Sequence, residues 1–357
     1  MLFRLVTGSP KARHIIVSLT TVGPVGDRLV ENGFNVVALE INAFSFLYKF
    51  LYLVKLIIKE KPDVVQTWMY HSDLIGGIAA KIAGVKNIIW NIRNTEIPQK
   101  ALSRTGLIIR VCAVLSTFIP NKIICCAYSA LHKHHELGYS RVKMLVIPNG
   151  YYMTYGANAN KRNEIRSSLG VADDVLLIGA VGRYDYLKGY DLLISSASIF
   201  SRQYLGKFAF ICVGKGVDEE NLELMEILNS VELQKRFILM GERSNLEAIY
   251  SAMDFYCLSS RSEGFPNVVA EAMLCGLPCV VTDVGDASRM IDHTGIVVDP
   301  KNAQSLAVGL LQMANLSYEN RKTLGDLARR RIIENYEIME IIKQYFSVYK
   351  LEGVDKS

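Results

Sequence analysis

Short apolar runs of β-prone residues alternate with segments of helical periodicity along most of the 357-residue chain. This alternation predicts parallel sheets covered by helices on both faces, because parallel strands are usually connected through a helix. A polar, weakly patterned stretch at 154–161 divides the predicted strands into two series of about six. The predicted strands are 14–19, 35–39, 63–68, 87–91, 122–127, 144–147, 175–181, 208–213, 237–240, 254–258, 278–282 and 295–298.

Two such series predict two doubly wound, Rossmann-like α/β domains that face a cleft, and the chain is long enough to give each its own core. The expected domains are 1–155 and 156–333, with a closing segment at 334–357 whose helix, predicted from residue 334, crosses back to the first domain. In these folds ligands bind at the carboxyl ends of the strands. Motifs that follow strand ends are therefore the candidate sites.

The charge of the chain is unevenly distributed. Residues 1–150 hold 18 Lys and Arg against 8 Asp and Glu, whereas the rest of the chain has an excess of acidic residues. A basic N-terminal half favours an anionic partner such as a membrane surface or a polyphosphate. The alternative is an ordinary solvated surface.

Two helices predicted in the basic half bear on this choice. In residues 44–60 an apolar stripe is accompanied by Lys49, Lys55 and Lys59 and by several aromatic residues, and residues 104–118 are apolar on nearly every side. Either helix could rest on a membrane interface, although packing against the sheet is the simpler explanation of each stripe. No uncharged apolar stretch is long enough to predict a transmembrane helix, and no secretion signal is expected. The seven cysteines mostly lie in apolar runs and are expected to be buried thiols.

The segment 259–273, Ser-Ser-Arg-Ser-Glu-Gly-Phe-Pro-Asn-Val-Val-Ala-Glu-Ala-Met, predicts a turn and a helix directly after a buried strand. Pro266 suits the first helical position. The N–H groups of that helix end would point at whatever lies before Gly264, and such ends attract phosphate or sugar oxygens. Glu263 and Glu271 flank this end, which suggests a ligand rich in hydroxyl groups; capping or solvated carboxylates are the alternative.

A second motif, Gly182-Arg183-Tyr184-Asp185-Tyr186-Leu187-Lys188-Gly189, follows the predicted strand 175–181. A planar guanidinium and an ammonium five residues apart, with glycines that allow close backbone approach, suit a diphosphate. The G-K-[ST] sequence of a P-loop is missing. Gly214 belongs to a further glycine-rich strand end. Together with the helix end near Gly264, these residues predict a nucleoside diphosphate site.

These motifs, in this order, resemble the retaining glycosyltransferases of family four. The resemblance rests on G-R-x-x-x-x-K-G, a glycine turn after the next strand, and E-G-F-P-N-V-V-A-E-A-M-x-C-G-L-P-C-V-V-T, and covers most of the chain. It implies a GT-B fold and sugar transfer from a nucleotide donor. With the upstream sequence 68–74, Trp-Met-Tyr-His-Ser-Asp-Leu, the chain looks like bacterial transferases of capsule, O-antigen or lipopolysaccharide synthesis.

The resemblance also implies roles for individual residues. Arg183 and Lys188 would bind the donor diphosphate and neutralise the leaving group, and Glu263 would contact the donor sugar and stabilise positive charge at its anomeric carbon. Glu271 would bind the ribose hydroxyls, and Arg243 would lie beside the base. The remaining expected donor contacts are Gly182, Gly214, Gly264, Phe265, Asn267 and Val268, the last three through backbone N–H groups because Pro266 has none.

The resulting prediction is a metal-independent, retaining hexosyltransferase that needs no cofactor. It would move a hexose or N-acetylhexosamine from a donor, UDP-linked or similarly activated, to a lipid-linked saccharide, without nucleic acid, in the cytoplasm and peripherally on the inner face of the cell membrane. The alternatives are a non-catalytic or truncated GT-B-like nucleotide-sugar-binding subunit and a GT-B sugar-nucleotide epimerase. The sequence does not determine the donor sugar and base, the acceptor and linkage, or the oligomeric state.

The chain departs from the family pattern in its N-terminal half. Residues 1–8 resemble the last turns of the family's first helix, so the first strand and its Gly-Gly loop are expected to be missing. Arg93 or Asn94 stands where the family often has a histidine near the donor sugar. His71 is expected on the acceptor side, with Arg93 and Asn94, or else as a structural histidine.

Overall fold

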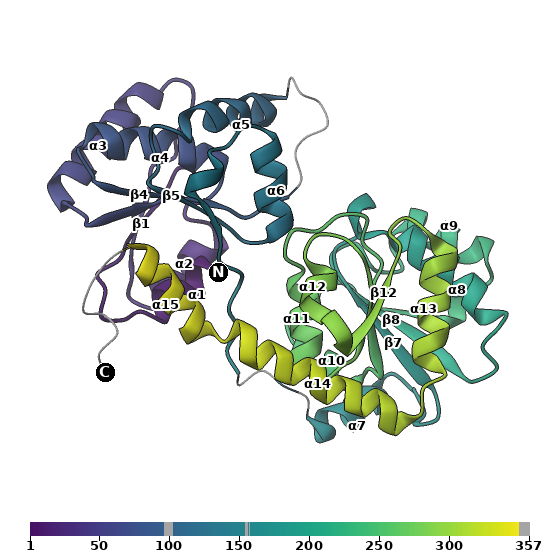
Figure 1. The fold of residues 1–357 in the computed structure, drawn as a ribbon. Coiled ribbons are helices and arrows are strands. Elements are labelled where there is room, and N and C mark those ends of the chain that lie inside the picture. Colours follow the sequence, from purple (N-terminus) through teal and green to yellow (C-terminus); the bar gives the residue numbers. More distant parts are fainter. Residues whose placement is uncertain (96–102, 154–155, 157, 350–357) are drawn as a thin grey trace. The chain divides into compact units, whose positions relative to one another are not determined.

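The computed structural model describes residues 1–95, 103–153, 156 and 158–349 (Figure 1). It divides into two compact units: residues Met1–Tyr151 with the closing helix form the N-terminal unit, and Tyr152–Glu337 form the C-terminal unit. The expected domain boundary at residue 155, part of the polar stretch around it (154, 155 and 157) and the last residues of the closing segment, 350–357, lie outside the described residues.

Every predicted strand is present, with ends that differ by a few residues at most. The strands are β1 (Ile15–Ser18), β2 (Asn35–Ala38), β3 (Val64–Gln66), β4 (Asn87–Ile92), β5 (Lys122–Cys125), β6 (Met144–Val146), β7 (Leu176–Val181), β8 (Phe208–Val213), β9 (Phe237–Leu239), β10 (Phe255–Leu258), β11 (Cys279–Thr282) and β12 (Gly295–Val298). Their apolar, often continuous composition is typical of parallel strands that are covered on both faces.

Helices connect the strands in both units. The N-terminal unit contains α1 (Leu2–Thr7), α2 (Gly23–Glu31), α3 (Phe46–Glu60), α4 (Tyr70–Ile82), α5 (Arg104–Leu115), α6 (Tyr128–Glu136) and α15 (Ile338–Tyr349). The C-terminal unit contains α7 (Ala159–Ser168), α8 (Tyr190–Ser201), α9 (Leu222–Ser230), α10 (Leu246–Ala252), α11 (Asn267–Leu274), α12 (Ala287–Ile291), α13 (Ala303–Ala314) and α14 (Tyr318–Tyr336). Short 3-10 turns complete them: η1 (Arg141–Lys143), η2 (Tyr186–Lys188), η3 (Gln234–Arg236) and η4 (Asp292–Thr294).

The C-terminal unit is a doubly wound domain. Its six parallel strands have the order β12-β11-β10-β7-β8-β9. The chain therefore builds the sheet outward from β7 in one direction and then returns to build it outward from β10 in the other. Figure 1 shows α8, α9 and α13 on one face of this sheet, and α11 and α12 on the other. Residues from β7, β8, α8 and α13 are the main contributors to the largest buried apolar cluster of this unit.

The six strands of the N-terminal unit form two separate parallel sheets. One pairs β1 with β2, and the other has the order β3-β4-β5-β6. No strand in the described part of the chain is hydrogen-bonded to both β1 and β3, and the first described element is the helix α1. The sequence predicts this start, a helix with no strand before it. It does not predict that the strands belong to two sheets.

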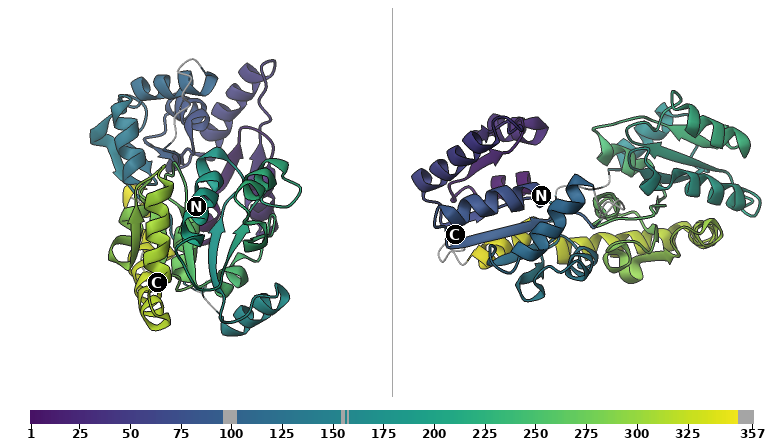
Figure 2. Two further views of the ribbon diagram at one scale, coloured as in Figure 1. Left: turned by 90° about the vertical axis from the view of Figure 1, so that its right-hand side faces the viewer. Right: turned by 90° about the horizontal axis from the view of Figure 1, so that it is seen from above.

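The closing helix α15 packs on the N-terminal unit, as Figures 1 and 2 show. Its buried side chains recur at helical spacing and join residues of α1, β4 and β5 in one core. Tyr345 also accepts a hydrogen bond from Asn91 at 3.1 Å. The predicted start of this helix at residue 334 is wrong by four positions: Glu337 is extended, so α14 ends at Tyr336 and α15 begins at Ile338.

Helix α3 buries only part of the apolar stripe that the sequence shows. Leu53, Val54 and Ile57 are buried, whereas Leu47, Leu51 and Ile58 are exposed. Packing against the sheet therefore does not account for the whole stripe. No helix in the described residues is both long and apolar enough to span a membrane. All seven cysteines are buried, and no disulfide joins these seven described side chains.

Candidate functional site

The candidate site lies at the carboxyl ends of β7, β8 and β10 in the C-terminal unit. The central neighbours β7 and β10 flank the point where the strand order reverses, which is where doubly wound domains bind their ligands. The Gly182–Gly189 motif follows β7, Gly214 follows β8, and the segment from Ser259 follows β10. The sequence motifs thus come from neighbouring strand ends, as expected.

Two glycines allow the loops after β7 and β8 to touch. Gly214 has φ +155°, and a Cβ atom there would lie 2.0 Å from the carbonyl oxygen of Gly182. Such a separation is far below van der Waals contact, so no larger residue fits without a backbone shift. Tyr190 fixes the same carbonyl by donating a hydrogen bond of 2.7 Å to it. The backbone of the glycine motif is therefore held from both sides.

Lys188 and Glu263 form an ion pair between the loops after β7 and β10. The Nζ of Lys188 donates to Oε1 of Glu263 at 2.6 Å, and the hydroxyl of Ser260 donates to the same oxygen at 2.7 Å. The Glu263 side chain is 10% exposed and that of Lys188 25%. The stem of Lys188 lies over Gly182, where a Cβ would be 3.4 Å from its Cδ. The structure therefore brings together three of the predicted donor-site residues.

The turn at Glu263 and Gly264 is supported by a loop that sequence analysis did not identify. Gly285, after β11, has φ +60°, and a Cβ there would lie 2.5 Å from the carbonyl oxygens of both Glu263 and Gly264. The Asp286 N–H donates to the Gly264 carbonyl at 3.0 Å. The β11 loop thus sets the direction of the turn that carries Glu263.

Arg183 stands apart from this ion pair. Its side chain is 65% exposed, and its Nε donates to Asp185 at 3.3 Å. No hydrogen bond or ion pair in the described residues joins it to Lys188 or Glu263. An exposed guanidinium in a glycine loop can turn toward an incoming anion without first breaking a buried contact.

Arg261 is a second structural residue that sequence analysis missed. It forms a two-bond ion pair with Asp191, at 2.7 and 2.5 Å, and donates to the Tyr186 carbonyl at 2.8 Å. These hydrogen bonds lower the pKa of Asp191. The Ser259 hydroxyl adds a bond to the Lys188 carbonyl at 2.9 Å. The two loops that carry Lys188 and Glu263 are therefore tied together independently of the Lys188–Glu263 pair.

The helix after this turn begins one residue later than predicted. Pro266 precedes α11 with an extended ψ of 91°, and Asn267 is its first helical residue. The Pro266 carbonyl accepts from the Val269 N–H at 3.1 Å, as at a helix start. Val268, at the second helical position, has no acceptor within the helix. Glu271 lies further along α11 and is half-buried.

The ring of Phe265, a predicted donor-site residue, is packed inside the C-terminal unit. The ring is buried and packs edge-on against Tyr336 of α14, with ring centroids 5.5 Å apart. Arg243 follows β9 at the same edge of the sheet and is exposed. Its loop is connected to the glycine loops, because the Gly241 carbonyl accepts from the Gly214 N–H at 2.8 Å.

The expected acceptor-side residues lie in the N-terminal unit. His71 is exposed in the first turn of α4, and Asn94 follows β4. Arg93 is bound into the structure: it donates to Asn149 and, at 3.3 Å, to Tyr345. Nothing in the described ranges brings three or more His, Cys, Asp or Glu side chains into a group that could hold a metal ion.

Comparison with known proteins identifies the class of the C-terminal unit. Residues 175–315 match the family model "Glycosyl transferases group 1", and these residues contain every predicted donor-site residue. The chain thus carries a glycosyl transferases group 1 domain, and its two Rossmann-like units form a GT-B fold.

Several individual proteins resemble most of the chain. The UDP-Gal:alpha-D-GlcNAc-diphosphoundecaprenol alpha-1,3-galactosyltransferase of Escherichia coli is 24% identical over 83% of this chain and 77% of its own length. The capsular polysaccharide biosynthesis glycosyltransferase CapM of Staphylococcus aureus is 24% identical over 87% and 82%. The crystal structure of Anabaena Alr3699/HepE in complex with UDP has a TM-score of 0.87 at 20% identity, over 98% of this chain and 94% of that one.

Proposed function

We propose that this protein is a retaining glycosyltransferase of surface polysaccharide biosynthesis. It moves a hexose or an N-acetylhexosamine from a nucleotide sugar, UDP-linked, to a lipid-linked saccharide. The observation that carries the proposal is the Lys188–Glu263 pair at the reversal point of the sheet within the glycosyl transferases group 1 domain. The pair offers a cation to a diphosphate and a carboxylate to a sugar from neighbouring loops.

In the proposed reaction, the bond between the anomeric carbon of the sugar and the donor phosphate oxygen breaks. The acceptor oxygen bonds to the anomeric carbon on the same face, and its proton passes to the departing phosphate. Arg183 and Lys188 neutralise the charge that develops on the leaving diphosphate, a role that a metal ion has in other transferases. No side-chain nucleophile and no metal are needed for this step.

Glu263 is suited to the positive charge that develops at the anomeric carbon. Without substrate its Oε1 is held by Lys188 and Ser260, so the carboxylate is already oriented. When a diphosphate draws the Lys188 ammonium toward itself, the carboxylate keeps the Ser260 bond and can accept from sugar hydroxyls. This exchange of partners avoids leaving a buried charge without compensation.

The remaining donor contacts are proposed from the motifs and their places after the strand ends. Gly182 and Gly214 let the diphosphate approach the backbone, the N–H groups of Phe265, Asn267 and Val268 orient sugar and phosphate, and Glu271 binds the ribose. Arg243 lies beside the base. In the N-terminal unit, His71 and Asn94 contact the acceptor, and Arg93 holds the loop that carries Asn94.

The names of two comparison proteins support the choice of substrates. The Escherichia coli relative is named as a galactosyltransferase that uses UDP-Gal and a diphosphoundecaprenol-linked acceptor, and the Anabaena structure contains UDP. At identities of 24% and 20%, the particular donor sugar of these proteins is not assigned to this chain. A UDP-linked donor and a lipid-linked acceptor are therefore proposed as classes.

A direct experiment incubates the purified full chain with radiolabelled UDP-glucose, UDP-galactose or UDP-N-acetylglucosamine and a bacterial lipid extract. Label in the organic phase, in a product with the donor's anomeric configuration by NMR, supports the proposal. An inverted product contradicts retention. Binding of a donor without transfer favours the alternative, a non-catalytic or truncated GT-B-like nucleotide-sugar-binding subunit. Conversion of the donor to an epimer favours the other alternative, a GT-B sugar-nucleotide epimerase.

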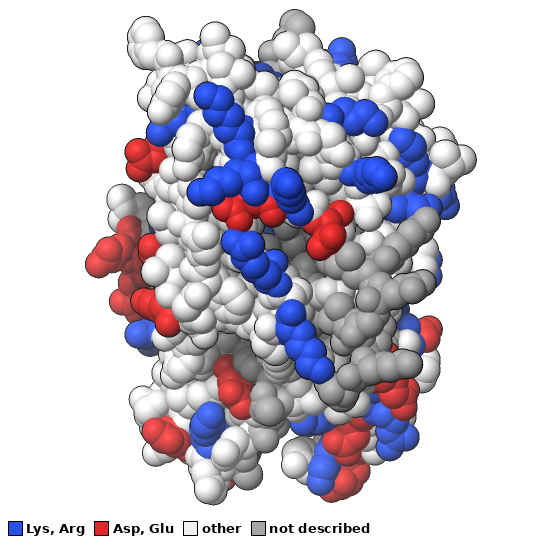
Figure 3. All heavy atoms as spheres, turned by 90° about the vertical axis from the view of Figure 1, so that its left-hand side faces the viewer, with Lys and Arg blue, Asp and Glu red and all other residues white. Residues whose placement is uncertain are grey.

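We further propose that the N-terminal unit lies on the inner face of the cell membrane through α3. This helix exposes Leu47, Tyr48 and Leu51 and also carries three lysines. Figure 3 shows a face of the molecule where Lys and Arg side chains, with some Asp and Glu, lie among broad uncharged areas. Exposed apolar side chains next to lysines suit an anionic interface.

Charge reversal on α3 tests this association. Replacing Lys49, Lys55 and Lys59 by Glu should weaken binding to vesicles of anionic lipid at low salt, with little effect on folding because no ion pair of the described chain uses these lysines. Unchanged vesicle binding would remove α3 from the proposal.

A further inference from the structure

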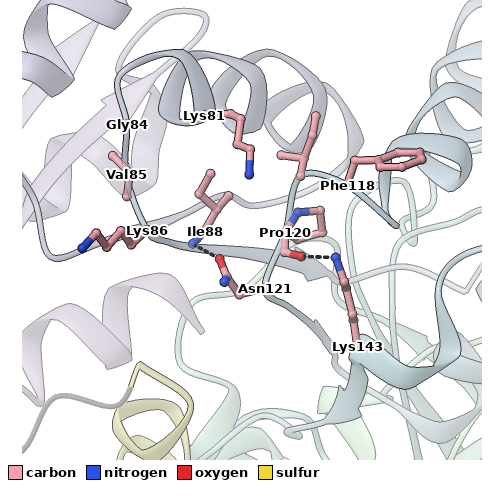
Figure 4. A pocket seen from close by; sticks show the side chains of 10 residues that line it. Lys81, Gly84, Val85, Lys86, Ile88, Phe118, Pro120, Asn121 and Lys143 are labelled. Carbon is pink, nitrogen blue, oxygen red and sulfur yellow. Dashed lines mark hydrogen bonds between the residues drawn. The ribbon is translucent and has the colours of Figure 1, made fainter.

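A pocket of about 540 Å³ lies in the N-terminal unit, at the edge where β4, β5 and β6 begin (Figure 4). The strands of a doubly wound sheet present their ligand sites at the opposite edge. The pocket is therefore separate from His71, Arg93 and Asn94, which follow strand ends. Its lining consists of Lys81, Gly84, Val85, Lys86, Ile88, Phe118, Ile119, Pro120, Asn121 and Lys143.

Two of the lining lysines face the pocket without a carboxylate. Figure 4 shows Lys81 pointing from the end of α4 toward the Pro120 loop, with Lys143 on the far side of that loop and Lys86 pointing away from both. The Lys143 ammonium donates to the carbonyls of Thr117 at 2.6 Å and Pro120 at 2.8 Å, which uses two of its three N–H groups. The lining contains no Asp or Glu, and no ion pair among the described residues includes Lys81 or Lys143.

No lining carboxylate balances the positive charge of these two lysines at the pocket. Burial lowers the pKa of Lys143, and the charge of Lys81 lowers it further, so the two ammonium groups repel each other. An anion bound at Lys81 would offset this repulsion. Asn121 adds a neutral donor: its Oδ1 accepts from the Ile88 N–H at 2.9 Å, which leaves the amide Nδ2 for another acceptor.

The rim of the pocket is apolar and exposed. Phe118, which lines the pocket, is 69% exposed. Ile82 and Val142, the chain neighbours of the two lysines, are also exposed. A freely soluble phosphate gains nothing from such side chains. A lipid places its phosphate against cations and its acyl chains against apolar groups.

We propose that this pocket binds the phosphate of an anionic phospholipid headgroup. Lys81 and the Asn121 amide donate to the phosphate oxygens, Lys143 adds positive charge from the far side of the Pro120 loop, and Phe118 lies against the acyl region. The site adds a specific headgroup contact to the association proposed for α3. It does not take part in sugar transfer.

The test compares single charge changes in the full-length protein. Binding is measured by co-sedimentation with vesicles of phosphatidylcholine alone and of phosphatidylcholine with about one third phosphatidylglycerol. Lys81→Ala should weaken binding to the anionic vesicles about 30-fold, because it removes a charged hydrogen bond as well as a charge. Lys81→Arg should restore most of it. The matched control Lys86→Ala removes the same charge from a side chain that points away from Lys81 and Lys143, and it should weaken binding to the anionic vesicles by about fivefold at most.

Equal losses of vesicle binding in Lys81→Ala and Lys86→Ala would overturn the proposal, because nonspecific attraction to an anionic surface depends on the charge removed and not on which lysine carries it. A competition arm separates the two sources of phosphate: inorganic phosphate should release the protein from vesicles no better than sodium chloride of equal ionic strength. Preferential release by phosphate would assign the pocket to a free anion and also overturn the lipid assignment. Lys81→Ala should leave sugar transfer to a detergent-dispersed acceptor unchanged. The transfer assay therefore tests the proposed function, and the vesicle assay tests the lipid pocket.

Discussion

The ammonium of Lys188 and the carboxylate of Glu263 meet 2.6 Å apart at the point where the strand order of the C-terminal sheet reverses. The residues are 75 positions apart in the sequence. Contacts that do not involve either charge hold the two loops in place, chiefly the Arg261–Asp191 pair. The pair can therefore open toward a ligand while its loops stay where they are.

Arg183 should contribute to kcat/KM for the donor but not to the free energy of unfolding. Its side chain is exposed and, among the described residues, its one ion pair is with Asp185, so Arg183→Ala should change the free energy of unfolding by less than about 0.5 kcal/mol. Loss of a charged contact to the diphosphate should lower kcat/KM about 10- to 100-fold. Urea denaturation and donor kinetics of the same preparation check this. The control Asp185→Ala removes the partner of Arg183 but not its charge, and a variant Arg183→Ala with normal kinetics would exclude the residue from the site.

Chelation should have no effect on transfer. In the proposed mechanism Arg183 and Lys188 carry the charge-neutralising role, so EDTA should leave the rate unchanged within error. The assay is run with and without EDTA, and with Mg²⁺ or Mn²⁺ added back. Inhibition by EDTA that added metal reverses would contradict a metal-independent step.

Gly214→Ala should abolish donor binding, because its Cβ would collide with the Gly182 carbonyl and push the glycine loop out of position. The matched control is Gly276→Ala. That glycine also has a positive φ, +72°, but a Cβ there would meet nothing within 4 Å, so only the conformational strain of about 1 kcal/mol remains. Calorimetric titration with UDP should show binding in the control and none in Gly214→Ala; equal affinities would mean that the contact between the loops is not needed.

Asp73 should make stability depend on pH. It is fully buried at the start of α4, and burial raises its pKa from 3.8 to about 8, although Thr67 donates to it at 2.5 Å. The folded state therefore holds this proton more tightly than the unfolded state. The contribution of Asp73 to stability is present in full below pH 4, and should be lost by up to about 1.4 kcal/mol per unit as pH rises toward 8.

Asp73→Asn keeps an acceptor for Thr67 but cannot titrate, so it should remove this part of the pH dependence. Urea denaturation of both proteins at pH 5 and pH 8 gives the comparison. The variant should gain stability relative to the wild type at pH 8. A constant difference between the two proteins across this range would show that Asp73 does not titrate in it.

The strands could be predicted from sequence because parallel strands covered on both faces are continuous apolar runs between polar segments. The grouping of β1 and β2 in a separate sheet could not, since strand pairing depends on contacts between distant segments. Likewise, the stripe on α3 shows a periodic apolar surface, but only the packing shows that Leu47 and Leu51 stay exposed.

The candidate site shows the same division. Lys188 and Glu263 follow strand ends in recognisable motifs, so their proximity could be predicted. Gly285 supports the Glu263 turn from the loop after β11, and its local sequence contains no pattern that predicts this contact. Arg261 lies inside the most informative segment, but its partner Asp191 is 70 residues away.

The most direct measurement of the central claim compares Glu263→Gln with the wild type. The amide has the shape of the carboxylate and can still accept from Ser260, but it has no charge to offer at the anomeric carbon. We expect UDP binding within about threefold of the wild type, since any change comes through Lys188 alone, and transfer from the best labelled UDP-sugar into the lipid fraction reduced about 100- to 1,000-fold. Transfer at the wild-type rate by Glu263→Gln would contradict the proposed site.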